Sequence, residues 1–236
     1  MKAYIIGDKK NSVAVNGMMS CANSLTKLNS DLFLEIVQQT SPKNLKEELR
    51  HFYINTDIDL KWTYPLNDES GIDEETGMSL KPYRTNSIDK IFSCTVSHAK
   101  LWLKCVQLEE EIMILEHDAI FTRKFKRFEW EGGVLGLNDP RRATHSSLIY
   151  HNLASLREGV HSAPWVSSYT AMPQGLAGNS AYIIRPKFAD MLLMKLKEKG
   201  GWPNDAIMCK QFFPMQLKVV YPYYTTIQGI KSTTTL

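Results

Sequence analysis

Two acidic residues, Glu116 and Asp118, directly follow the apolar run of residues 112–115. The run is too short for a helix and is typical of a fully buried strand, so both carboxylates are expected at a strand end. Divalent cations such as Mn²⁺ and Mg²⁺ prefer oxygen ligands and also accept diphosphate oxygens. The pair therefore indicates a metal site that neutralises the charge of a departing diphosphate. The alternative is a strand-end turn whose acids are simply solvated.

The elements that must position this pair predict an α/β fold. Residues 4–6 form a short apolar strand, a helix with apolar positions at helical spacing follows from Ser12, and residues 31–37 form a second strand. Strand, helix and strand open a βαβ unit, whose two strands are parallel. Further elements are expected as a helix over about 87–110, strands at 133–137 and 181–184, and a helix from Pro186 to the glycines at 200–201.

This alternation favours a layered α/β/α sandwich of the Rossmann type, as a single domain over residues 1–236. The most polar stretch, residues 64–87, is expected to be a long surface loop rather than a domain boundary. Ligands of such folds bind beyond the carboxyl ends of the strands, which is where Glu116 and Asp118 are predicted.

Composition and charge exclude several classes of protein. With 43% hydrophobic and 22% charged residues, the 236-residue chain is typical of a globular protein with a sizeable core. No apolar stretch of about 18 residues is present to span a membrane, and the first residues lack the pattern of an export signal. The net charge of +3 is well below that of a typical nucleic-acid-binding protein. A cytoplasmic location is therefore expected, with reduced thiols at Cys21, Cys94, Cys105 and Cys209.

Further motifs stand in a defined order around the acidic pair. The helix upstream contains Ser97-His98, the strand downstream contains Tyr182, and Asp205 follows in a Pro-Asn-Asp triplet. The tail adds Tyr221-Pro222, Gln228 and Ser232-Thr233. In this order and spacing, residues 88–236 resemble glycosyltransferase family 25, the lipooligosaccharide galactosyltransferase type with a GT-A fold.

The resemblance implies a GT-A-like fold and an inverting sugar transfer. The donor would be a nucleotide-diphosphate sugar, predicted to be a UDP-sugar, and the acceptor a hydroxyl group. Glu116 and Asp118 match the outer acids of the family's acidic triplet, which would hold Mn²⁺ or Mg²⁺ and the donor diphosphate. The family's acceptor is a cell-surface oligosaccharide.

Four other residues carry roles that the resemblance implies. Ser97 and His98 match a serine-histidine pair near the donor, and Tyr182 is expected to pack first and to contact the donor second. Asp205 matches an acid near the acceptor and is the candidate catalytic base. It is equally well interpreted as the cap of a helix starting near residue 206, because aspartate is a favoured cap residue.

The sequence departs from the family pattern at three places. His117 replaces the middle acid of the triplet, no arginine occurs in residues 11–28, and no histidine follows His161 to serve as a C-terminal metal ligand. These departures keep a second interpretation open. It is a non-catalytic polyanion-binding module on a degenerate glycosyltransferase fold.

Residues 122–130 combine four cations with three aromatic residues and follow the acidic pair closely, so they are expected near the mouth of the active site. The cations are Arg123, Lys124, Lys126 and Arg127. Such a pattern suits a polyanion, with cations on phosphates and aromatic faces on unstacked bases. It would equally suit anionic membrane headgroups or a solvated turn. A hydroxymethylated pyrimidine in DNA is therefore a second candidate acceptor beside the oligosaccharide.

Overall fold

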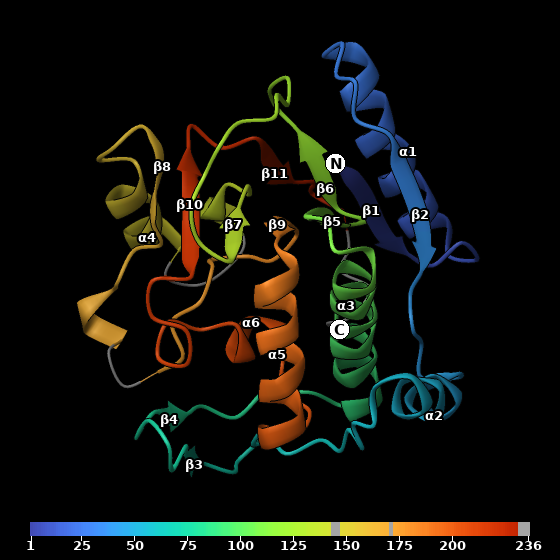
Figure 1. Cartoon of the computed structure of the whole chain (residues 1–236), viewed down its shortest axis with the longest axis vertical. Coiled ribbons are helices and arrows are strands. Elements are labelled where there is room, and N and C mark those ends of the chain that lie inside the picture. Colours follow the sequence, from blue (N-terminus) through green and yellow to red (C-terminus); the bar gives the residue numbers. More distant parts are fainter. Residues whose placement is uncertain (143–146, 170–171, 231–236) are drawn as a thin grey trace.

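The centre of the fold is a seven-stranded mixed sheet in the order β2-β1-β5-β9-β7-β10-β8 (Figure 1). The computed structural model describes residues 1–142, 147–169 and 172–230. The strands are β1 (Lys2–Gly7), β2 (Leu34–Gln38), β5 (Ile112–Glu116), β7 (Val134–Gly136), β8 (Gly159–Ser162), β9 (Ala181–Ile184) and β10 (Leu217–Tyr221). Strand β1 pairs in parallel with both β2 and β5, which confirms the predicted βαβ unit. Strand β9 runs antiparallel between β5 and β7, and β8 runs antiparallel to β10 at one edge.

The helices are α1 (Ser12–Lys27), α2 (Leu45–Thr56), α3 (Ile88–Leu108), α4 (Ser147–Ala154), α5 (Pro186–Lys199) and α6 (Asn204–Ile207). Two small sheets add β3 (Gly71–Ile72) with β4 (Ser79–Leu80), and β6 (Ala119–Phe121) with β11 (Thr225–Ile227). The predicted helices correspond to α1, α3 and α5, whereas α2 was not predicted. In the described part of the chain, no helix combines the length and the apolar character that crossing a membrane requires.

Each face of the sheet carries its own apolar core. Along β5, Ile112 and Ile114 point into the core shared with α3 and α5, which lie side by side in Figure 1. Met113 and Leu115 point the other way, into a core that α1 covers together with the β6–β11 pair. All four side chains are fully buried, as the continuous apolar run predicts. The layered α/β arrangement is thus confirmed, with a small sheet beside α1 in the second layer.

Residues 64–87 contain the β3–β4 hairpin and lie against the α5 side of the molecule. Met78 and Leu80 are buried, and the ammonium of Lys199 on α5 lies 2.6 Å from a carboxylate oxygen of Asp73. This attachment holds Tyr83 beside the site described below.

Candidate functional site

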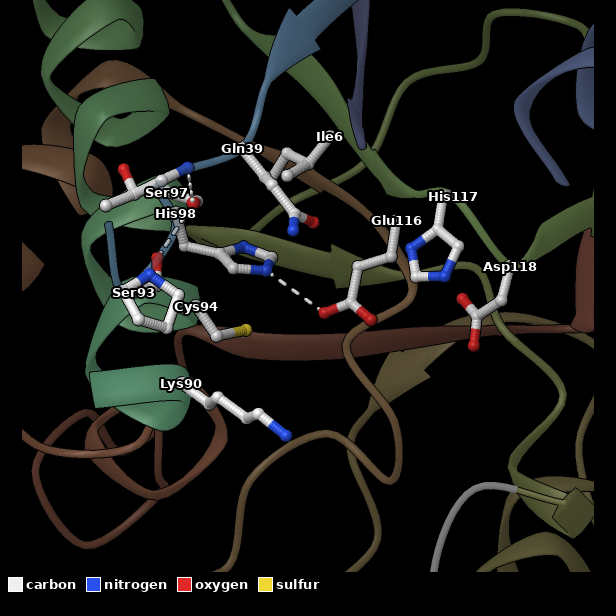
Figure 2. Close-up of a pocket in the computed structure, with 12 residues that line it drawn as sticks. Ile6, Gln39, Lys90, Ser93, Cys94, Ser97, His98, Glu116, His117 and Asp118 are labelled. Atoms are coloured by element: carbon white, nitrogen blue, oxygen red, sulfur yellow. Dashed lines mark hydrogen bonds and ion pairs between the residues drawn. The ribbon is translucent and has the colours of Figure 1, made fainter. Parts of the chain in front are cut away.

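A small pocket opens at the carboxyl ends of β1 and β5 (Figure 2). Glu116 ends β5 and is paired in register with Ile6 of β1. The cavity of about 70 Å³ has room for an ion and several water molecules, because one water needs about 10–15 Å³ of such a cavity. Its lining residues are Ile6, Gln39, Thr40, Pro42, Lys90, Ser93, Cys94, Ser97, His98, Glu116, His117 and Asp118. The pocket therefore brings Ser97 and His98 together with the acidic pair.

The turn that carries Asp118 is held by contacts from two distant segments. The backbone N–H of Gln228 donates to the carbonyl of Asp118 at 2.7 Å, and the Gln228 side chain donates to the carbonyls of Gly17 and Ala119 at 3.0 Å each. Gly17 on α1 lies so close to the carbonyl oxygen of His117 that a Cβ atom would overlap it. The backbone that carries the Asp118 side chain is therefore held in place from two sides.

The pKa values of Glu116 and Asp118 are shifted in opposite directions. Burial raises the pKa of Asp118 to about 7, and the charge of Glu116 adds to this effect. Burial acts in the same direction on Glu116 and is the largest single influence, but a hydrogen bond from His98 and the electrostatic effects of His98 and His117 together outweigh it and lower the pKa. One carboxylate oxygen of Asp118 is buried and finds no hydrogen-bond donor among the described residues. Two adjacent carboxyls, one of them short of donors, suit a divalent cation that prefers oxygen ligands.

His98 connects Glu116 to a buried hydrogen-bond chain. Its Nε2 lies 3.1 Å from an oxygen of Glu116, and its Nδ1 lies 2.7 Å from the hydroxyl of Tyr182. The indole N–H of Trp102 donates to the same hydroxyl at 3.0 Å. The carboxylate of Glu116, whose pKa is lowered, can only accept, so the imidazole proton lies on Nε2 and is donated to Glu116. Nδ1 then accepts the hydroxyl hydrogen of Tyr182.

One face of α3 supplies the opposite wall of the pocket. Lys90, Ser93, Cys94 and Ser97 recur at helical spacing, so they share this face. The Ser97 hydroxyl donates to the carbonyl of Ser93 and accepts from the N–H of Thr40, both at 2.8 Å, which ties the loop after β2 to α3. Direct contact of Ser97 with a donor stays a prediction. Sequence reasoning missed Lys90 and Cys94, although their spacing to Ser97 was available.

A second, larger cavity of about 480 Å³ lies beside Asp205. Tyrosines 64, 83 and 150 contribute to its walls, and Asp205 is exposed to it. Partial loss of hydration in this cleft raises the pKa of the Asp205 carboxyl, and the nearby charge of Glu116 raises it further. Burial raises the pKa of Tyr83 to about 12, and the nearby charges of Asp205 and Glu116 add to this effect. The two cavities are therefore close enough for their acids to interact.

The cap interpretation of Asp205 is not supported by the geometry of α6. The cap position of this short helix is occupied by Pro203, and no side chain makes a capping hydrogen bond there. Asp205 lies in the first helical turn instead. The backbone N–H groups of Asp205 and Ala206 lie near its carboxyl and partly offset the rise in its pKa, and its role as a base stays a prediction.

Comparison with known proteins now identifies the family. A sequence profile of glycosyltransferase family 25, described as an LPS biosynthesis protein family, matches residues 78–208, which is more than half of the chain. The chain belongs to glycosyltransferase family 25. A glycosyltransferase 25 family member of Drosophila pseudoobscura pseudoobscura is 37% identical over 75 residues, which are 31% of this chain. The matched part is only 11% of the length of that relative.

Two solved glycosyltransferases are loosely similar in structure. Mouse xyloside xylosyltransferase 1 in its apo form has a TM-score of 0.45 and 10% identity, over 93% of this chain and 84% of the other. The apo WbbM bifunctional glycosyltransferase has the same score and identity, over 94% of this chain and 38% of the other. We infer nothing further about this family 25 member from either one.

Tyr182 has a different place in this family 25 member from the predicted one. Its side chain is fully buried and is absent from the lining of either cavity. Its hydroxyl is engaged by His98 and Trp102. Direct donor contact is therefore corrected to an indirect role, in which Tyr182 acts on the pocket through His98.

The basic segment of the family 25 chain does not lie at the mouth of the pocket, so that prediction is wrong. Arg127 lies 3.2 Å from Glu111, the residue before β5, and Glu116 lies at the other end of this strand, about 16 Å away at 3.3 Å per residue. Arg123 begins the segment by donating to the carbonyl of Pro222. Neither cavity has Arg123, Lys124, Lys126 or Arg127 in its lining.

The aromatic residues of this segment face the protein core. Phe125 and Trp130 are buried, and Phe128 stacks on Tyr224 with ring centroids 5.8 Å apart. Phe125 meets the same tyrosine edge-on. Stacking of Phe125 and Trp130 on nucleic-acid bases is therefore corrected to packing in the core beside α1. The quoted Ser232-Thr233 motif lies outside the described residues.

Proposed function

We propose that this family 25 protein is a metal-dependent, inverting glycosyltransferase that uses a nucleotide-diphosphate sugar, with UDP as the nucleotide. The observation that carries the proposal is that Glu116 and Asp118, at the end of β5, line the same pocket as Lys90. Two carboxylates and an ammonium are complementary to a metal diphosphate, because the acids bind the cation and the ammonium pairs with phosphate oxygens.

The residues present suit Mn²⁺ or Mg²⁺. Asp118 has a buried oxygen that lacks a donor, and Glu116 has a lowered pKa that keeps it ionised. These two residues would hold the cation, with His98 holding the carboxylate of Glu116 in place. When bound, such a cation supplies charge neutralisation for the leaving diphosphate. Lys90 would add a second positive charge on the opposite wall.

Asp205 is the proposed base. In the transfer step, the acceptor hydroxyl oxygen bonds to the anomeric carbon, the bond from that carbon to the diphosphate oxygen breaks, and the hydroxyl proton passes to the Asp205 carboxylate. The raised pKa of Asp205 favours this role, because a base works best when its pKa approaches the operating pH. The acceptor would bind in the cavity of about 480 Å³, a size within the usual range for ligand sites.

We propose an oligosaccharide of the lipooligosaccharide type as the acceptor, rather than DNA. The tyrosines of the larger cavity suit the apolar face of a sugar, whereas the DNA hypothesis depended on the basic segment, whose cations are absent from both cavity linings. A cytoplasmic location is part of the proposal. It is supported by four free cysteines, because thiols persist in reducing compartments.

The test is a screen of nucleotide sugars for donor hydrolysis and transfer with Mn²⁺ present. We expect Asp118→Ala to reduce turnover by at least about 100-fold, as loss of a major electrostatic group does. Asp190→Ala is the matched control, because Asp190 is exposed on α5. Unchanged turnover in Asp118→Ala would remove the metal site from the proposal. Inactivity with every donor would favour a non-catalytic module.

The dependence of transfer on salt concentration tests the class of acceptor. Transfer to a small saccharide should hardly change between about 50 and 200 mM salt, whereas transfer to DNA should fall steeply because phosphate contacts release counterions. Steep salt dependence together with activity on hydroxymethylated DNA would overturn the saccharide assignment.

A further inference from the structure

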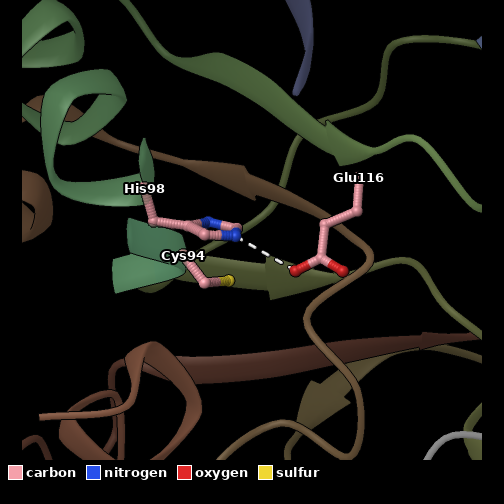
Figure 3. Close-up of side chains that lie close together, drawn as sticks. All are labelled: Cys94, His98 and Glu116. Atoms are coloured by element: carbon pink, nitrogen blue, oxygen red, sulfur yellow. Dashed lines mark hydrogen bonds and ion pairs between the residues drawn. The ribbon is translucent and has the colours of Figure 1, made fainter. Parts of the chain in front are cut away.

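Glu116 belongs to two different sets of possible metal ligands. On one side it is followed by Asp118, which offers a second carboxylate. On the other side it meets Cys94 and His98 of α3, as Figure 3 shows. The Cys94 sulfur, an imidazole nitrogen of His98 and a carboxylate oxygen of Glu116 all lie within 4.8 Å of one another. The second set has a different chemistry, since it contributes one sulfur, one nitrogen and one oxygen.

We propose that Cys94, His98 and Glu116 form a binding site for a thiophilic divalent cation such as Zn²⁺. Zinc accepts thiolate, imidazole and carboxylate ligands in tetrahedral arrangements, with bonds of about 2.0–2.3 Å. Ligand atoms of such a site lie about 3–4 Å apart, and the His98 and Glu116 atoms are already 3.1 Å apart. Mn²⁺ and Mg²⁺ prefer oxygen ligands, so this set selects against them. Water or a phosphate oxygen from the pocket, which all three residues line, would complete the four-coordinate set.

The surroundings of the three ligands accommodate the cation. Zinc-bound imidazoles donate their other N–H to a neighbouring acceptor, and the oxygen of Tyr182 lies 2.7 Å from Nδ1 of His98. A hydroxyl both donates and accepts, so Tyr182 serves either tautomer. The Asn204 side chain lies 4.0 Å from the Cys94 sulfur, and its amide can turn its N–H toward a thiolate. Binding releases the thiol proton of Cys94 to solvent.

Sharing of Glu116 makes the two cations compete for one carboxylate. A zinc ion bound to Cys94 and His98 would keep the Glu116 carboxylate away from Asp118. Zinc would then displace Mn²⁺ and inhibit transfer. This competition rests on the proposed metal-dependent function, whereas zinc binding itself does not.

Cobalt(II) is the probe for the site, because it replaces zinc and is coloured. We expect the metal-free protein to bind Co²⁺ with the strong visible absorption of four-coordinate cobalt and a thiolate charge-transfer band. Cys94→Ser should abolish the charge-transfer band and weaken Zn²⁺ binding by about 100-fold or more, since loss of an outer-shell partner alone costs 10–100-fold. Cys105→Ser is the matched control on the same helix and should keep both properties. Asp118→Asn should keep them too, because Asp118 is not a ligand.

The outcomes separate this site from the proposed catalytic one. A pale, six-coordinate cobalt spectrum in the wild-type protein would overturn the proposal, as would a thiolate band that survives Cys94→Ser. Competition is measured by the electron paramagnetic resonance signal of free Mn²⁺, which should rise when Zn²⁺ is added to wild-type protein but not to Cys94→Ser. If Mn²⁺ never binds while the cobalt result holds, the catalytic proposal fails and the zinc site stands.

Discussion

The hydroxyl of Tyr182 lies 2.7 Å from Nδ1 of His98, and this contact decides which nitrogen of the imidazole faces Glu116. The hydroxyl also accepts the indole N–H of Trp102, so its own hydrogen is left for His98. All three side chains are at most 1% exposed. Tyr182 and Trp102, which do not line the pocket, thus act through His98 on the orientation of the Glu116 carboxylate.

Tyr182→Phe should weaken the metal site without removing a ligand. The change leaves Nδ1 of His98 and the N–H of Trp102 without their partner, so the proton of His98 is no longer confined to Nε2. We expect Mn²⁺ affinity and kcat/KM to fall by about 10–100-fold, the usual cost of losing an outer-shell partner. Mn²⁺ affinity is measured by titration and kcat/KM by steady-state transfer.

The control for this change is Tyr4, which lies in the same row of side chains across neighbouring strands of the sheet. Tyr4 pairs with Ile114 in register, and Ile114 pairs with Tyr182. Tyr4 is also 1% exposed, but it lies apart from His98, so Tyr4→Phe should alter neither quantity beyond about 2-fold. Equal losses in both variants would indicate a general packing effect and contradict the role of the Tyr182 hydroxyl.

The raised pKa of Asp118 predicts how stability changes with pH. Its pKa is about 7 in the folded protein against an ordinary value of 3.8, so the unfolded chain loses this proton first as the pH rises. The metal-free protein therefore loses stability between about pH 4 and pH 7 through this group. Asp118→Asn should raise the free energy of unfolding at pH 8 by about 1–3 kcal/mol, because one pKa unit corresponds to about 1.4 kcal/mol.

Thermal unfolding with and without Mn²⁺ checks this prediction. Mn²⁺ should stabilise the wild-type protein at pH 8 and should not stabilise Asp118→Asn, since binding to the folded state raises its stability. At pH 4, where the carboxyl is protonated in the folded wild-type protein and partly protonated in the unfolded chain, the two metal-free proteins should melt at similar temperatures. If Asp118→Asn is less stable than wild type at pH 8, the ionised carboxylate of Asp118 does not destabilise the folded protein.

Asp205→Asn tests the proposed base. The amide keeps the size of the side chain but cannot take the proton of an acceptor hydroxyl. We expect kcat to fall by about 100- to 10,000-fold, the range for loss of general base catalysis. Donor binding should be retained, because Asp205 lines the larger cavity and not the metal pocket. A fall in donor affinity with unchanged kcat would assign Asp205 to binding.

Much of the fold was predictable because its signals are local. The apolar run of residues 112–115 is β5, and Pro186 begins α5 while Gly200 follows its end. Helix α2 was missed because only two of its residues, Leu45 and Phe52, are buried. Its apolar stripe is therefore too narrow to be recognised from the periodicity of the sequence.

The site was predictable only where a motif described it. Ser97, His98, Glu116 and Asp118 share one pocket, as their order along the chain indicates. The course of residues 122–130 depends instead on β6 pairing with β11, in which Phe121 meets Thr225, about a hundred residues away in sequence. Neither the composition nor the spacing of this segment contains that information.

The position of the basic segment predicts that its charges are dispensable for transfer to a saccharide. Lys124→Ala with Lys126→Ala removes two exposed cations, and we expect kcat/KM to change by less than about 2-fold. The free energy of unfolding should change by less than about 0.5 kcal/mol, as is usual for exposed positions. Loss of transfer at low salt would indicate that an anionic acceptor binds this face.

Gly17→Ala should damage the metal pocket from the opposite side of the sheet. In an ordinary helix, alanine in place of glycine stabilises by about 0.8–1.0 kcal/mol. Here the new Cβ would overlap the carbonyl oxygen of His117, a backbone atom in the turn that carries Asp118. Because that turn is also held by Gln228, it cannot move away without losing hydrogen bonds. The overlap should therefore outweigh the helix propensity, and we expect a loss of about 1–3 kcal/mol, the usual cost of overpacking.

Measuring both the free energy of unfolding and the Mn²⁺ affinity separates the effect of the overlap from the effect of helix propensity. Asn16→Ala is the control on the same helix, because Asn16 is exposed and its replacement changes helix propensity without approaching the turn. Gly17→Ala should lower the melting temperature and the Mn²⁺ affinity together, since displacement of the turn moves the Asp118 carboxylate away from Glu116. If Gly17→Ala instead stabilises the protein as alanine does elsewhere, the close approach of α1 to this turn does not position the acidic pair.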